Sequence, residues 1–102
     1  MFLSLKIISI NKNNEYVLQS EKSKKRYTLM LEFYDVEKPQ IGDRLLISKT
    51  LLDKNSQLFC QPYAFAAADK SVIDNFAQND SNDDIVVLSN LNKNIILQRI
   101  YG

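Results

Sequence analysis

Apolar and polar side chains alternate along much of this chain, most regularly from Arg26 to Tyr34. In a β-strand successive side chains point to opposite faces, so this alternation predicts strands with one face on a core and the other partly in water. The pattern predicts strands, in chain order, at Phe2–Ile10, Glu15–Ser20, Arg26–Tyr34, Arg44–Ser48, Gln57–Cys60, Ile85–Ser89 and Asn94–Tyr101. Within the first of these, two adjacent apolar residues, Ile7 and Ile8, predict a break in register.

Turn-forming residues separate these strands. Asn11–Asn14 predicts a turn, because asparagine tolerates left-handed backbone angles, and Glu21–Lys25 predicts a polar hairpin tip. Gly42 follows Pro39 in the next loop and supplies the backbone freedom that a turn needs. The last two strands are predicted to pair as a hairpin around Asn90–Lys93.

One segment, Ala66–Asn79, has helical rather than alternating spacing. Ser71 and Asp74 have the spacing of a capping box within it. Pro62 is expected to stop the preceding strand short of Tyr63, unless that strand lies at a sheet edge. The chain is therefore expected to form four or five strands, one short helix and a final strand pair.

We expect a single, mainly β domain over residues 1–102, because many short strands at near-regular spacing favour a sandwich or a small barrel. A short helix before the final strand pair is similar to the arrangement of an OB-fold. The expected fold is therefore a small, OB-like antiparallel β-barrel, and an SH3-like barrel is the alternative.

Composition excludes several kinds of chemistry. The 102 residues include one Cys and no His, which excludes a disulfide framework, a histidine base and metal sites built from histidines or several cysteines. No glycine-rich phosphate loop and no nucleophile elbow is present. We therefore expect no enzymatic activity, no cofactor and no metal.

The apolar start of the chain does not have the pattern of a signal peptide. Ser4, Lys6 and Ser9 interrupt it at near-alternate positions, and no segment has the roughly 18 apolar residues needed to span a bilayer. A lone Cys60 is compatible with a reducing compartment. We expect a cytoplasmic protein without membrane contact.

Two segments together suggest a family. Leu31–Arg44 combines a strand, an acidic turn with a proline and a Gly-Asp step, and Ile95–Gly102 ends in an aromatic-glycine pair. In these features the chain resembles small uncharacterised bacterial proteins of similar length. The resemblance implies an OB-like barrel in a bacterial setting, and it implies no activity.

The predicted hairpin tip between the second and third strands is the first candidate site. OB-folds bind oligonucleotides through strand faces and loops, with bases stacking on aromatic side chains. The candidate contacts to phosphates and bases are Lys22, Lys24, Lys25, Arg26, Tyr16 and Tyr27. The alternative is a solvated tip whose charges keep the sheet edge soluble. The net charge is only +1, so the basic character is local.

A second candidate site lies in the C-terminal half, with aromatic and arginine residues of the kind enriched at binding hot spots. Its candidate partner contacts are Tyr63, Phe65, Arg99 and Tyr101. We expect a non-catalytic interaction module that binds another protein or serves as an assembly subunit. Binding of single-stranded nucleic acid or RNA at the basic tip is the alternative.

Overall fold

The computed structural model describes residues 2–55, 63–78, 84–91 and 93–101. Seven strands and two α-helices lie in these residues. In chain order they are β1 (Phe2–Asn11), β2 (Glu15–Ser20), β3 (Arg26–Tyr34), β4 (Arg44–Ser48), α1 (Lys49–Asn55), β5 (Tyr63–Ala67), α2 (Lys70–Gln78), β6 (Ile85–Asn90) and β7 (Lys93–Tyr101). A single turn of 3-10 helix, Lys12–Asn14, joins β1 to β2.

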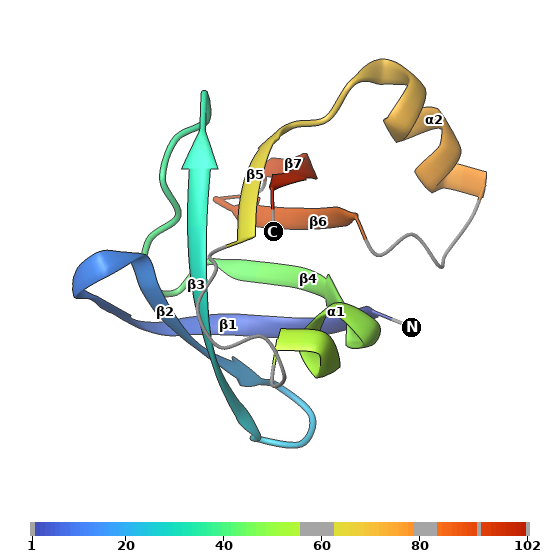
Figure 1. The fold of residues 1–102 in the computed structure, drawn as a ribbon. Coiled ribbons are helices and arrows are strands. Elements are labelled where there is room, and N and C mark those ends of the chain that lie inside the picture. The colour runs from blue at the N-terminus through green and yellow to red at the C-terminus, as the bar shows by residue number, and fades with distance from the viewer. Residues whose placement is uncertain (1, 56–62, 79–83, 92, 102) are drawn as a thin grey trace.

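The strands form one sheet that closes into a ring, in the order β1-β2-β3-β5-β7-β6-β4 (Figure 1). The first three strands are joined by hairpins, and β4 returns to pair with the far edge of β1. This gives the spatial order 4-1-2-3 of a Greek key. The expectation of a mainly β protein is confirmed.

The ring is not fully antiparallel, which corrects the expected antiparallel barrel. Six neighbouring pairs are antiparallel, and β3 pairs with β5 in parallel. The reason is that the number of strands is odd. In a closed ring of seven strands, direction cannot reverse at every neighbouring pair. At least one parallel pair is then required, and here it is β3 with β5, which β4 and α1 separate in the chain.

The inner face of the ring holds the hydrophobic core. Alternate residues of β1, β2, β3 and β4 point inward, and Leu5, Leu18 and Leu45 have no exposed surface. The core cluster also includes Tyr16, Leu29, Leu31, Ile47, Leu51, Leu52, Tyr63, Phe65, Val86, Leu88 and Leu97 among others. At about 25 cal/mol per Å² of apolar surface removed from water, this interior dominates the stability of the fold.

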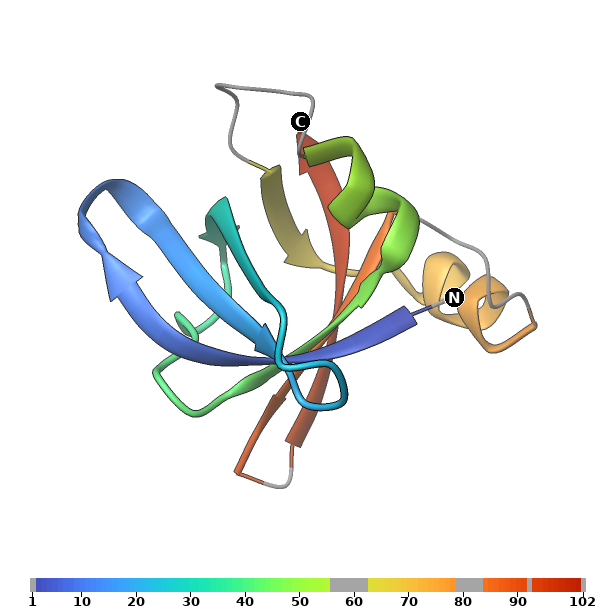
Figure 2. The same cartoon turned by 90° about the horizontal axis from the view of Figure 1, so that it is seen from below.

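Helix α1 is absent from the sequence-based expectation, which had one helix only. Its N-cap is Ser48, whose hydroxyl accepts a hydrogen bond from the Leu51 backbone N–H at 3.3 Å. Leu51 and Leu52 belong to the core cluster, so the helix is held by packing at the end of β4 (Figure 2). No helix in the described part of the chain is long and apolar enough to cross a membrane.

Helix α2 is shorter than the segment that helical spacing predicted. It begins at Lys70, because β5 continues to Ala67 and pairs with both β3 and β7. The Ile73 N–H donates to the Asp69 carbonyl oxygen at 3.0 Å, so Ser71 lies inside the helix and is not its cap. In both ribbon views α2 lies outside the ring (Figures 1 and 2).

Most other expectations about elements are confirmed. β2, β3 and β4 have the predicted bounds, and β1 contains a register shift between Ile7 and Ser9. Gly42 has φ of 100°, as a turn that needs glycine requires. β5 starts at Tyr63, directly after Pro62, but lies inside the sheet rather than at an edge. The strand predicted at Gln57–Cys60 lies outside the described residues.

Candidate functional site

A row of polar and cationic side chains crosses the outer face of four adjacent strands. Arg44 of β4 lies opposite Lys6 of β1, Lys6 lies opposite Gln19 of β2, and Gln19 lies opposite Arg26 of β3. We call these four residues the cation row. Its three cations are all solvent-exposed, because their strand neighbours point into the core. With strands about 4.8 Å apart, the row extends over about 14 Å.

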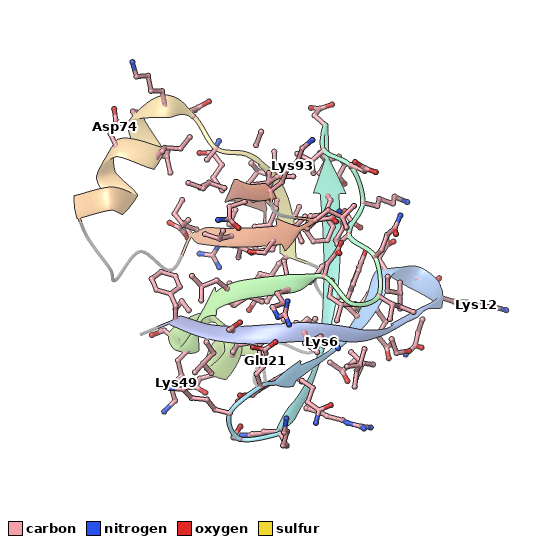
Figure 3. All side chains as sticks on the ribbon, turned by 180° about the vertical axis from the view of Figure 1, so that it is seen from behind. Lys6, Lys12, Glu21, Lys49, Asp74 and Lys93 are labelled. Atoms are coloured by element: carbon pink, nitrogen blue, oxygen red, sulfur yellow. The ribbon has the colours of Figure 1, made fainter. Side chains whose placement is uncertain are left out.

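Two like charges face each other in this row. Lys6 and Arg44 are direct cross-strand neighbours, an arrangement that destabilises a sheet when it is not compensated. Glu21 supplies a partial compensation, since the Arg44 Nε donates to its Oε1 in an ion pair. This hydrogen bond, with the charges of Arg44, Lys6 and Lys24, holds the pKa of the Glu21 carboxyl below its usual value. Figure 3 shows Lys6 and Glu21 close together on one face.

The hairpin tip between β2 and β3 continues this basic surface and has a defined conformation. The Lys24 N–H donates to the Ser20 carbonyl oxygen at 3.0 Å, and the Ser20 N–H donates to the Lys25 carbonyl oxygen at 2.9 Å. Lys24 has φ of 62°, so the tip turns through the left-handed region. All four basic residues predicted here are exposed, namely Lys22, Lys24, Lys25 and Arg26. The structure therefore brings the predicted basic tip and the cation row together.

The two tyrosines predicted to stack on bases are not available as proposed. Tyr16 is 3% exposed and makes an edge-to-face contact with Phe33, with ring centroids 5.7 Å apart. Burial raises the pKa of its phenol. Tyr27 is half-buried and packs against the core, and the Lys25 ammonium lies over its ring at 5.2 Å. The prediction of Tyr16 as a stacking platform is wrong, because even-numbered residues of β2 point inward.

The predicted partner-binding site is also largely inside the protein. Tyr63 is 2% and Phe65 is 1% exposed, so neither presents a surface patch. Arg99 forms an ion pair with Asp84 at 2.6 Å and lies over the Tyr63 ring at 5.8 Å, which ties it to its own chain. The side chain of Tyr101 lies outside the part of the molecule that the structure describes. Tyr63 and Phe65 are thus core residues, because both point to the inner face of β5.

Sequence reasoning missed three members of the charged surface: Lys6, Arg44 and Glu21. Lys6 and Arg44 are 38 positions apart, so only the pairing of β1 with β4 makes them neighbours. Glu21 is the first residue of the predicted hairpin tip, and only the fold brings it to an arginine of another strand. The alternation of the two predicted strands already places Lys6 and Arg44 on the face away from the core. The sequence does not show that these strands pair, or which residues lie opposite each other.

A pocket of about 260 Å³ lies on another side of the molecule, between the end of β3 and the β1–β2 turn. It is lined by Asn14, Tyr16, Leu31, Glu32, Phe33, Tyr34 and Lys38. The Tyr34 hydroxyl donates to Glu32 Oε2 at 2.6 Å, and this bond raises the pKa of the phenol. Among the described residues no cluster of three potential metal ligands occurs.

Comparisons of the chain with protein-family models, with curated proteins and with solved structures gave no match. The function proposed below therefore depends on the geometry and charge of the cation row and of the hairpin tip beside it.

Proposed function

We propose that this protein is a non-catalytic module that binds single-stranded nucleic acid or RNA through the cation row and the β2–β3 tip. The observation that carries the proposal is the exposed Lys6 and Arg44 pair, held opposite each other across two strands. Such a pair lowers its own repulsion when an anion lies between or above the two charges. A chain of phosphates provides that anion repeatedly along the row.

The local charge supports this proposal more strongly than the net charge does. Six of the 13 basic residues gather on the row and tip, although the chain carries only +1 overall. They are Lys6, Lys22, Lys24, Lys25, Arg26 and Arg44. Glu21 is the carboxylate that pairs within this surface in the described structure. A concentrated basic stripe on one face is the electrostatic footprint of nucleic-acid binding.

The topology supports an OB-like assignment, which we also propose. The 4-1-2-3 order of the first four strands is a Greek key, and the OB-fold is a five-stranded Greek-key barrel that binds oligonucleotides on a strand face. This chain departs from it with two further strands in the ring. We further propose a cytoplasmic location in a bacterium, on the sequence resemblance given above.

Fluorescence anisotropy with a labelled single-stranded oligonucleotide tests the proposal. We expect binding to the wild-type protein at low salt that weakens as salt rises, because phosphate contacts release counterions. Lys6→Glu should lower the affinity about 10-fold at low salt, since it replaces a contact with a repulsion. The double variant Lys24→Glu, Lys25→Glu should lower it further.

Lys12→Glu is the matched control, because it makes the same charge change at an exposed lysine of the β1–β2 turn, away from Lys6 (Figure 3). Its affinity should stay within about twofold of wild type, as is usual for a charge distant from the contact surface. Equal losses in Lys6→Glu and Lys12→Glu would show a diffuse charge effect and contradict the site. Absence of binding at low salt would contradict the function.

Binding to another protein is a second candidate function. Tyr63 and Phe65 are buried, so its contact has to lie elsewhere on the surface. The favouring observation is Leu91, which is 91% exposed in the turn between β6 and β7 and has φ of 44°. A leucine that is exposed in a positive-φ turn adds nothing to the core, and we propose it as the contact to a partner. An immobilised wild-type protein should retain a partner that Leu91→Ser loses, and identical retention by both would contradict this candidate.

A further inference from the structure

A recess lies beside the cation row, between the first residues of β1 and the start of the β2–β3 tip. Its volume is about 460 Å³, within the range of pockets that hold small organic ligands. It is lined by Phe2, Leu3, Ser4, Ser20, Glu21, Lys22 and Leu46. Part of the hairpin tip thus forms one of its walls. The rest of the lining comes from outward positions of β1 and β4 (Phe2, Ser4 and Leu46) and from two inward positions, Leu3 and Ser20.

The recess and the cation row share strands β1 and β4 and lie next to each other along them. Ser4 pairs with Leu46 in the β1–β4 ladder, and Lys6 pairs with Arg44 in the same ladder two residues away. Residues two apart on a strand share a face and lie about 7 Å from each other. A ligand whose anionic group lies on Lys6 and Arg44 can therefore place an attached ring in the recess.

The lining has the chemistry that a nucleobase requires. Phe2 and Leu46 supply apolar surface for the flat faces of a ring. The Ser4 hydroxyl can donate or accept a hydrogen bond at the edge of the ring. Glu21 gives only one oxygen, Oε1, to the ion pair with Arg44, and a carboxylate has about four acceptor positions.

We propose that the recess seats one unpaired nucleobase, while the cation row binds the neighbouring phosphates. Glu21 then accepts a hydrogen bond from the exocyclic amino group of the base, as carboxylates do from cytosine. The recess is therefore selective for cytosine over thymine or uracil, which present a carbonyl at that position. This inference deepens the proposed function and depends on it.

The first arm of the test compares oligonucleotides of equal length by anisotropy, with oligo(dC), oligo(dT) and an abasic chain that has the same number of phosphates. Wild-type protein should bind oligo(dC) at least about 5-fold more tightly than the abasic chain, because a base held against apolar side chains adds to phosphate binding. Equal affinity for oligo(dC) and the abasic chain would overturn the recess and leave the row intact. No binding of either chain would instead overturn the proposed function, and the recess with it.

The second arm fills the recess. Ser4→Phe places a bulky side chain in its lining from an exposed position, so the core is not disturbed. It should reduce oligo(dC) affinity to that of the abasic chain, and the affinity for the abasic chain itself should not change. Ser71→Phe, at an exposed position of α2, is the matched control and should keep the wild-type difference. A Ser4→Phe protein that still distinguishes the two chains would overturn the proposal.

The third arm tests the role assigned to Glu21. Glu21→Gln should raise the affinity for every chain, because a negative charge leaves the phosphate surface. It should also reduce the preference for oligo(dC) over oligo(dT) by about threefold, since glutamine presents a donor as well as an acceptor. An unchanged preference would overturn the assignment of Glu21 as the acceptor.

Discussion

Two adjacent cross-strand pairs of the β1–β4 ladder differ completely in environment. Leu5 lies opposite Leu45, and both are fully buried in the core. One residue along, Lys6 lies opposite Arg44, and both are exposed and positively charged. The inner pair stabilises the fold by removing apolar surface from water. The outer pair brings like charges together, which opposes folding, and Glu21 compensates this in part through its ion pair with Arg44.

The largest expected effect breaks the inner pair. Leu45→Ala should lower the free energy of unfolding by about 2–5 kcal/mol, because it removes buried methyl groups and leaves a cavity. Urea denaturation followed by circular dichroism measures the change. Lys6→Ala on the neighbouring outer pair is the control, and it should change the same quantity by less than about 0.5 kcal/mol. Similar decreases in unfolding free energy in the two variants would contradict the conclusion that the inner pair stabilises the fold and the outer pair does not.

A smaller effect concerns the one buried side-chain oxygen or nitrogen atom that has no hydrogen-bond partner among the described residues. The Tyr63 hydroxyl is buried there without a hydrogen bond, and burial raises its pKa. Tyr63→Phe should raise the free energy of unfolding by about 1 kcal/mol, because an unsatisfied buried hydroxyl opposes folding. Thermal unfolding would show a higher Tm, and a clearly lower Tm would mean that the hydroxyl is satisfied in solution.

A still smaller effect is expected at Leu91, a leucine in a backbone conformation that favours glycine. Leu91 has positive φ and is almost fully exposed, so no burial of its side chain offsets the steric cost of this backbone conformation. Leu91→Gly should raise the free energy of unfolding by about 0.5 kcal/mol, because glycine adopts positive φ without a steric penalty. Leu91→Ala retains the Cβ atom and should not show this gain. An equal response of the two variants would remove backbone strain as the cause.

The smallest expected change in stability comes from the Glu21–Arg44 pair. The pKa of Glu21 is lower in the folded protein than the ordinary value of 4.5, so the pair's contribution is fully present above about pH 4.5. It is lost as pH falls below that value and the carboxylate becomes protonated. Glu21→Gln should therefore be slightly less stable than wild type at pH 7, and the difference should shrink as pH falls and Glu21 of the wild type becomes protonated. A difference that does not shrink would assign the effect to packing.

The strands were predictable where one face is buried and the other is wet. The alternation from Arg26 to Tyr34 gave the correct bounds of β3, and the doubled isoleucines gave the position of the register shift in β1. The identity of the parallel β3–β5 pair was not predictable, because β4 and α1 separate these two strands in the chain and only the fold brings them together. Helix α1 is short and is held by Leu51 and Leu52 in the core, so its local pattern was weak.

The candidate site was predictable only in its local part. The basic tip from Lys22 to Arg26 is contiguous in the chain, and the structure leaves its cations exposed as expected. Tyr16, Tyr63 and Phe65 were misassigned, because residue type does not reveal which face of a strand points inward. The Lys6–Arg44 pair needs the register between two strands that are distant in sequence, and that register is set by the buried Leu5–Leu45 pair beside it.

The most direct test is the salt dependence of oligonucleotide binding by wild-type protein and by the double variant Lys6→Gln, Arg44→Gln. Each phosphate contact on a single strand contributes about −0.7 to the slope of log K against log salt concentration, so loss of two contacts should make the slope shallower by about 1.4. The unfolding free energy should remain close to that of wild type. An unchanged slope, with a stable variant that binds as wild type does, would contradict the assignment of the cation row as the phosphate-binding surface.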